Sequence, residues 1–180
     1  EMVVKEIGVA TSGQGTRQAG LDAIAATITG WGIDTTGLVL GDGSGLSLDN
    51  RVSCATMLGV LQHAGVSSAV GQGLAVAGET GTMASVFVDT PLAGRLLGKT
   101  GTLSNPPFNA DPPAVKGLAG YLPTDSTGGA IEFVLLLNGD PNGLPITEQD
   151  AYRPVWAELA NALNSFPAVA SPEDLGPRVP

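Results

Sequence analysis

The 180-residue sequence is short of cysteine, histidine and positive charge, and each shortage excludes a class of protein. A single cysteine, Cys54, excludes an internal disulfide framework and a cysteine-based zinc cluster, and a single histidine, His63, leaves little room for a His-rich metal site. Eight Lys and Arg residues against 17 Asp and Glu residues give a net charge of −9, the opposite of what nucleic acid or an anionic membrane requires. No apolar run approaches the roughly 20 residues that span a bilayer, so we expect no transmembrane segment in this chain.

Glycine and proline are plentiful instead, with 26 and 13 residues, and hydrophobic residues make up 43% of the chain against 14% charged ones. The glycines follow no Gly-X-Y period, so the composition excludes a collagen-like chain and indicates many turns. The hydrophobic content is sufficient for a sizeable core, and the length fits one domain.

Cap residues and apolar periodicity predict three helices. Thr16 caps the first, over residues 16–29, and Ser53 caps the second, over residues 53–64. The third helix is predicted over residues 150–165, where tryptophan, leucine and alanine recur on one face.

Three strands are predicted in the second half of the chain, over residues 95–103, 115–122 and 130–137. The last is nearly all apolar, so we expect it at the centre of the sheet. Turn residues at 125–129 predict a hairpin between the last two strands, and short connections make the strands antiparallel. Antiparallel strands followed by a covering helix indicate an α+β fold rather than a doubly wound one.

The first half of the chain gives weaker signals. Residues 38–40 predict a short buried strand that leads into a tight loop, and residues 65–94 are glycine-rich and irregular. Residues 1–8 resemble the last turns of a helix, but no cap residue precedes them. We therefore expect a longer protein, in which the lack of a signal peptide says nothing of location.

At the other end, residues 167–180 carry four prolines without periodicity and predict an extended surface tail. Residues 1–166 are accordingly expected to belong to the folded domain.

The most specific stretch of the sequence is Lys99-Thr100-Gly101-Thr102, which allows two interpretations. With Ala93 and Gly98 it fits a relaxed phosphate-binding loop, which must open a helix because the helix N-terminus holds the phosphates. Residues 101–107 contain a glycine and two prolines and cannot continue such a helix, so we reject nucleotide binding at this segment.

The second interpretation is a strand that presents these residues to a ligand. Strand alternation puts the hydroxyls of Thr100 and Thr102 side by side, and with the Lys99 ammonium group they suit a carboxylate. Gly101 leaves the strand bare, so an extended peptide can lie along it at a sheet edge, where a backbone N–H could face a developing oxyanion. For an isolated Lys-Thr-Gly triplet, a core strand with a solvent-reaching lysine would be the better explanation.

The surrounding segments favour the ligand-binding interpretation. A Gly-Asp-Gly-Ser-Gly-Leu-Ser loop with Asn50 comes first, Ala77-Gly78-Glu79-Thr80-Gly81-Thr82-Met83 comes next, and the Lys-Thr-Gly strand precedes Gly117-Leu118-Ala119-Gly120-Tyr121-Leu122. In this order, over most of residues 1–166, they resemble the low-molecular-mass class C penicillin-binding proteins, the D-alanyl-D-alanine carboxypeptidase/endopeptidase family.

The resemblance implies a penicillin-recognising serine peptidase fold, of the β-lactamase and transpeptidase type, and a hydrolase of peptidoglycan stem peptides in the cell wall. In that family a serine attacks the penultimate D-Ala carbonyl and forms an acyl-enzyme, which β-lactams also form, without metal or cofactor. By motif match, Lys99 supplies positive charge near the Ser-x-Asn serine, and Thr100 and Thr102 bind the substrate carboxylate beside Gly101. The backbone N–H of Thr102 is one oxyanion donor. The substrate also implies an extracytoplasmic location.

Two family motifs are missing from the sequence. The lysines Lys5, Lys99 and Lys116 are preceded at −3 by Met, Leu and Pro, so there is no Ser-x-x-Lys, and there is no Ser-x-Asn. In the family both motifs lie upstream of a helix like residues 1–8, so we expect them in the N-terminal part of the same protein. The chain by itself is expected to be inactive.

Smaller departures and isolated residues carry less information. Leu48 stands where the family loop usually has Arg, and the connection 103–114 is longer than usual, as a surface insertion or a rim over the site. Asp42 and Ser44 are interpreted as parts of a tight structural turn, since the pattern fits neither a calcium loop nor a hydrolase elbow. Cys54 is expected to be a quiet core thiol, and His63 a residue at a helix C-terminus.

A different class of function fits the same strand. A non-catalytic module could use the Lys99 strand to capture peptide C-terminal carboxylates. The residues upstream of the chain discriminate between the two, because the enzyme requires Ser-x-x-Lys and Ser-x-Asn there.

Overall fold

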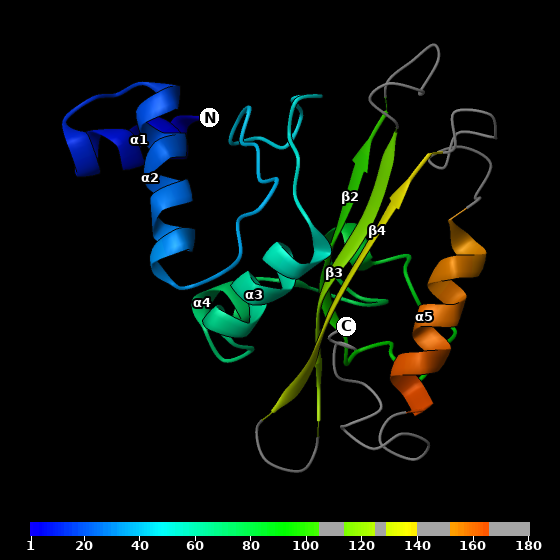
Figure 1. The fold of residues 1–180 in the computed structure, drawn as a ribbon. Coiled ribbons are helices and arrows are strands. Elements are labelled where there is room, and N and C mark those ends of the chain that lie inside the picture. The colour runs from blue at the N-terminus through cyan, green and yellow to red at the C-terminus, as the bar shows by residue number, and fades with distance from the viewer. Residues whose placement is uncertain (105–113, 125–128, 140–151, 166–180) are drawn as a thin grey trace.

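A computed structural model describes residues 1–104, 114–124, 129–139 and 152–165. A twisted antiparallel sheet lies between helices: α1 to α4 are on one side of it and α5 is on the other (Figure 1). The helices are α1 (Met2–Ser12), α2 (Arg17–Gly30), α3 (Cys54–Ala64), α4 (Ala69–Gln72) and α5 (Arg153–Ser165), with a 3-10 turn η1 at Gly81–Met83. The α+β class predicted from the sequence is confirmed.

The caps predicted for α2 and α3 are formed. The Thr16 hydroxyl accepts a hydrogen bond from the Ala19 N–H at 3.1 Å, and the Ser53 hydroxyl accepts one from the Thr56 N–H at 3.0 Å. Each satisfies an N–H that the first turn of a helix leaves without a backbone partner. The sequence signal therefore located both helix starts.

Helix α1 is longer than the sequence indicated, because it passes Gly8 and ends only at Gly13, in the left-handed conformation at φ 74°. Gly8 is buried against α2 near Gly20, where a Cβ would lie 1.9 Å from the Val4 carbonyl oxygen. The glycines thus permit two helices to cross closely rather than ending the first of them.

The sheet consists of β1 (Ala75–Val76), β2 (Leu97–Leu103), β3 (Val115–Pro123) and β4 (Ala130–Asn138), in that order, with every pair antiparallel. The prediction that the apolar third strand would be central is wrong within the described residues: β3 is the inner strand and β4 has one paired neighbour. Its apolar character reflects contacts with α3 and with the α5 layer, because side chains of a strand alternate between the two faces.

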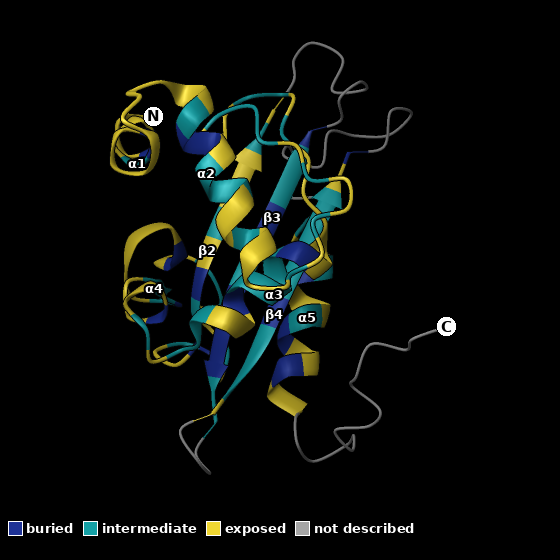
Figure 2. Ribbon diagram, turned by 60° about the vertical axis from the view of Figure 1, so that its left-hand side comes forward, coloured by how far each residue is buried: buried dark blue, intermediate teal, exposed yellow. Residues whose placement is uncertain are grey.

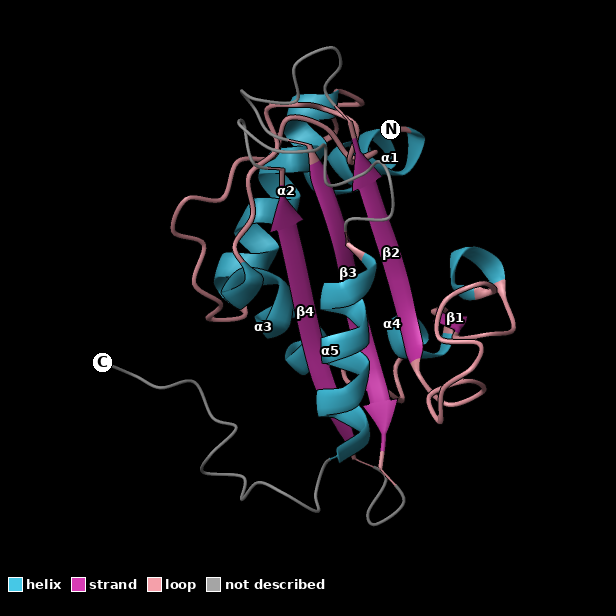
Figure 3. Ribbon diagram, turned by 90° about the vertical axis from the view of Figure 1, so that its right-hand side faces the viewer, coloured by secondary structure: helices cyan, strands magenta, loops and turns pink. Residues whose placement is uncertain are grey.

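The largest buried cluster lies on the α5 face of the sheet. Leu118 of β3 and Phe133 of β4 pack there with Trp156 of α5. Figures 2 and 3 show α5 lying along this face of the sheet. On the opposite face Tyr121, which is 0% exposed, donates a 2.7 Å hydrogen bond from its hydroxyl to the Leu61 carbonyl oxygen of α3. Both faces of β3 are therefore covered, which fixes the sheet between the helices.

Two further expectations need correction. Residues 38–40 form no buried strand: they contribute a single bridge between Val39 and Arg51, and Val39 is 46% exposed. The glycine-rich stretch at 65–94 is irregular, but it contributes α4, β1 and η1 to the fold and places Met83 in the core.

Some predictions fall outside the described residues. These are the hairpin turn at 125–128, most of the 103–114 connection, the start of the last helix before Tyr152 and the proline-rich tail. Among the described residues, no helix combines the length and the apolar character needed to cross a membrane.

Candidate active site

The Lys-Thr-Gly-Thr segment lies on β2, where the strand is paired on one side only. β1 pairs with Leu97 and Gly98 alone, whereas β3 pairs with the whole strand. Within the described residues, Lys99–Leu103 thus form an open sheet edge. A strand, not a helix, follows Gly98, so the segment lacks the helix that a phosphate loop requires.

The backbone polar groups of both threonines point to this open edge. The Leu96 carbonyl oxygen accepts a 2.9 Å hydrogen bond from the Ala77 N–H, on the β1 side of the strand. Residues two apart in a strand turn their N–H and C=O groups to the same side, so those of Thr100 and Thr102 face outward in line with Leu96. A peptide or an oxyanion at the edge can therefore reach them.

The side chains of the segment divide between the two faces. Thr100 pairs with Leu118, which belongs to the core on the α5 face, so Thr100 and Thr102 lie on that face and Lys99 on the α3 face. The sequence prediction that the two threonines share a face is confirmed. Lys99 is exposed, and its ammonium group donates to the outward carbonyl oxygen of Thr100.

Apart from Gly101 itself and its two chain neighbours, no described residue has a heavy atom within 4 Å of the place where a Cβ of Gly101 would stand. The strand surface at this point is therefore bare, as the sequence predicted. The open space extends the exposed surface between the two threonines along the edge.

Lys116 of β3 is a member of the cluster that the sequence did not indicate. It is the cross-strand partner of Thr102, and its Nζ donates a 2.8 Å hydrogen bond to the Thr102 Oγ1. The same Nζ lies 4.3 Å from the ring centroid of Tyr152 and 5.4 Å from that of Trp156. The ammonium group nearest the threonine hydroxyl is thus that of Lys116, whereas Lys99 contacts the backbone.

The loop after residue 40 is organised by Asp42. Its carboxylate accepts hydrogen bonds from the Ser44 hydroxyl at 2.6 Å and the Asn50 amide at 2.8 Å, and from the backbone N–H groups of three loop residues, Gly45, Leu46 and Ser47. The hydrogen bond from the Ser44 hydroxyl, and to a smaller extent that from the Asn50 amide, hold the Asp42 pKa well below its usual value. A structural turn, as expected, accounts for these residues.

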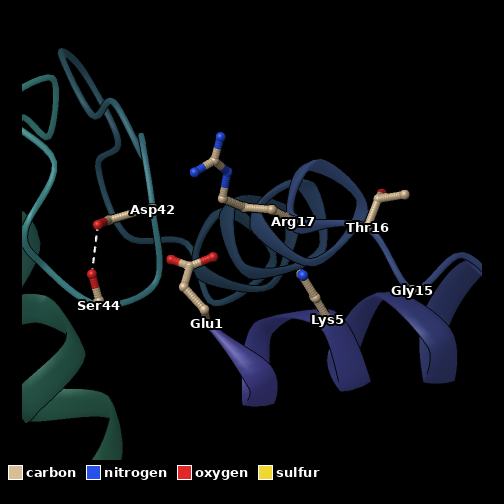
Figure 4. A pocket seen from close by; sticks show the side chains of 7 residues that line it. All are labelled: Glu1, Lys5, Gly15, Thr16, Arg17, Asp42 and Ser44. Atoms are coloured by element: carbon tan, nitrogen blue, oxygen red, sulfur yellow. Dashed lines mark hydrogen bonds between the residues drawn. The ribbon is translucent and has the colours of Figure 1, made fainter.

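This loop also contacts α1 and borders an open pocket. The Gly43 N–H donates to the Glu1 carboxylate at 2.9 Å, and the pocket lies between the loop and the start of α2 (Figure 4). Its lining comprises Glu1, Lys5, Gly15, Thr16, Arg17, Asp42 and Ser44. In the described part of the chain, no group of three or more His, Cys, Asp or Glu side chains is arranged to hold a metal ion.

The two single residues of their type lie away from the core. Cys54, at the start of α3, is exposed, so the expectation of a core thiol is wrong. His63 lies in the last turn of the same helix, as expected, and stacks on Trp31 with ring centroids 4.1 Å apart.

An antiparallel sheet between helices, with Lys-Thr-Gly-Thr on its open edge in the described residues, is consistent with the penicillin-recognising peptidase fold. The chain belongs to the D-Ala-D-Ala carboxypeptidase 3 (S13) family, whose model matches residues 1–159. The family resemblance inferred from the sequence is thereby confirmed.

Named relatives agree with this assignment. The chain is 38% identical over 168 residues to a D-alanyl-D-alanine carboxypeptidase of Actinomadura sp. (strain R39). The aligned region covers 89% of this chain and 29% of that protein. It is 32% identical over 153 residues to a carboxypeptidase of Mycobacterium tuberculosis, covering 79% and 31% of the two chains. A D-alanyl-D-alanine carboxypeptidase of Haemophilus influenzae is 30% identical over 131 residues, covering 70% and 25%. The chain therefore spans between 25% and 31% of the length of these relatives.

Proposed function

We propose that this chain is one part of a serine-type D-Ala-D-Ala carboxypeptidase or endopeptidase that acts on peptidoglycan stem peptides outside the cytoplasm and binds penicillins. Membership of the S13 family supports this proposal. The observation that carries it furthest is the open edge of β2, where both threonines turn their backbone polar groups outward.

In the proposed reaction a serine oxygen from a Ser-x-x-Lys motif outside these residues bonds to the carbonyl carbon of the penultimate D-Ala. The bond to the nitrogen of the terminal D-Ala breaks, and that residue leaves with the serine proton. Water then cleaves the ester, which restores the serine and releases the shortened peptide.

The residues of β2 have separate roles in this proposal. The Thr100 and Thr102 hydroxyls bind the terminal carboxylate, and Gly101 leaves room for the peptide along the edge. The outward backbone N–H of Thr102 donates to the oxyanion, where preorganised donors are most effective. Lys99, on the other face of the strand, supplies positive charge near the serine of the Ser-x-Asn motif.

Labelling with a fluorescent penicillin tests the proposal. The full-length protein should form a covalent adduct that survives denaturation, whereas purified residues 1–180 should form none, because they lack Ser-x-x-Lys. Labelling of the isolated chain would overturn the assignment of the nucleophile to residues outside it. A full-length protein that binds D-Ala-D-Ala peptides but neither hydrolyses them nor reacts with penicillin would instead be a carboxylate-binding module.

A further inference from the structure

Lys116 holds the Thr102 hydroxyl in a defined orientation. The two residues face each other across β2 and β3, and the lysine Nζ lies 2.8 Å from the Thr102 Oγ1. An ammonium group can only donate hydrogen bonds, so this contact occupies an acceptor lone pair of the hydroxyl. The hydroxyl hydrogen is left to donate elsewhere, and Thr102 is exposed.

The aromatic rings of Tyr152 and Trp156 hold the lysine in place. A cation over an aromatic face is attracted by the ring quadrupole, and both distances, 4.3 and 5.4 Å, fall within the range of that attraction. Trp156 is itself buried in the core on the α5 face, which makes the support rigid. A lysine that merely covered apolar surface would have no need of a hydrogen bond to the ligand-binding strand.

We propose that Lys116 is a positioning residue for carboxylate recognition: it orients the Thr102 hydroxyl as a donor and adds positive charge beside it. The proposal rests on the proposed function only in taking a peptide terminal carboxylate as the ligand. A carboxylate accepts hydrogen bonds and donates none, so a threonine with its acceptor already occupied suits this ligand. The charge also opposes the overall net charge of −9, which by itself repels an acidic ligand.

The test compares two probes on the full-length protein: diacetyl-L-Lys-D-Ala-D-Ala and the same peptide with a C-terminal amide. Isothermal titration of full-length protein in which the Ser-x-x-Lys serine is replaced by alanine, so that the acid is not hydrolysed, gives the dissociation constant for each probe. Steady-state kinetics on the active protein separate KM from kcat for the acid. Lys116→Met should weaken binding of the acid by about tenfold and that of the amide much less, with the increase appearing in KM. Lys116→Arg, which keeps the donor and the charge, should restore most of the affinity.

Two further variants separate positioning from a purely structural role. Lys5→Met removes the same charge from α1 and should bind both probes as the wild type does. Tyr152→Leu removes one supporting ring and should weaken binding of the acid peptide by a smaller factor than Lys116→Met does. Melting temperatures are measured for all variants, because a structural role would lower stability and affect both probes equally.

The possible results are distinct. Equal loss for acid and amide, or no loss in Lys116→Met, overturns the inference about Lys116. A wild-type protein that binds the acid in a Lys116-dependent manner but is not acylated by penicillin refutes the proposed enzyme and leaves the Lys116 inference standing. A wild-type protein that does not distinguish acid from amide overturns the carboxylate site altogether.

Discussion

The two ends of strand β2 are built differently. At its first end Gly98 is buried and is paired on both sides. Its partner on β3 is Gly120, and a Cβ added to Gly120 would lie 2.0 Å from the Leu97 carbonyl oxygen. At its other end the described residues pair with the strand on one side only, and none of them beyond its chain neighbours lies within 4 Å of where a Cβ of Gly101 would stand. Gly120 and Gly101 thus have opposite structural roles: Gly120 permits close packing of two backbones, and Gly101 keeps the strand surface free.

The largest expected effect is at the packed end. Gly120→Ala forces a methyl group against the Leu97 carbonyl, which must move and break the pairing of β2 with β3. We expect the full-length protein to lose about 3 kcal/mol of stability or more, measured by urea unfolding. A variant as stable as the wild type would contradict the close approach of these strands.

At the open end the largest effect is expected on chemistry. Lys99→Ala should slow acylation by a fluorescent penicillin by about 100-fold, and Thr100→Val, which keeps the shape but removes the hydroxyl, by about tenfold. Because Lys99 is exposed, its removal should leave the melting temperature nearly unchanged. Normal acylation in both variants would refute the site.

A smaller effect on stability is expected from Tyr121→Phe. Tyr121 pairs with Leu97 at the packed end of β2. The variant loses the hydrogen bond to the Leu61 carbonyl oxygen, but this oxygen still accepts one from the Gly65 N–H at 2.8 Å. Because the carbonyl keeps a partner, the free energy of unfolding should fall by only about 1 kcal/mol.

This difference should depend on pH. Burial, and secondly the negative charge of Glu132, raise the Tyr121 pKa, so the folded state keeps the phenol neutral. Its contribution to stability is complete below the unfolded pKa of about 10 and falls as pH rises beyond it, because only the unfolded chain then ionises. Tyr121→Phe has no phenol to ionise. The difference in free energy of unfolding between the wild type and this variant should therefore become smaller above about pH 10. A constant difference across this range would contradict the raised pKa.

The smallest effect on stability is expected from Gly101→Ala, the matched control for Gly120→Ala. Because no described residue beyond the chain neighbours of Gly101 lies near the added methyl group, the free energy of unfolding should change by no more than about 0.5 kcal/mol. Affinity for a D-Ala-D-Ala peptide should fall by about fivefold, since the methyl occupies the bare surface. A stability loss as large as that of Gly120→Ala would remove the contrast between the two ends.

The sequence predicted those elements whose signals are local. Thr16 and Ser53 marked helix starts because a cap acts within one turn, and the alternation in β2 located its two threonines correctly. Helix α1 was predicted too short, because a glycine that ends a helix and one that permits a helix crossing look alike in sequence.

Features that depend on pairing between distant segments could not be predicted in the same way. The two-residue strand β1 exists only through its contact with β2, and the position of β4 beside a single neighbour follows from the whole sheet. Lys116 was missed because the connection between β2 and β3 is too long to fix their register, so its position opposite Thr102 appears only in the structure.

The unpaired edge of β2 has a consequence for how the protein behaves at high concentration. A strand edge with unpaired backbone N–H and C=O groups can accept the exposed strand of another molecule, which is how sheets begin to aggregate. The exposed Lys99 ammonium group rests on the outward Thr100 carbonyl and so places a positive charge where such an intruding strand would dock. One side chain can thereby discourage self-association through this edge of the sheet.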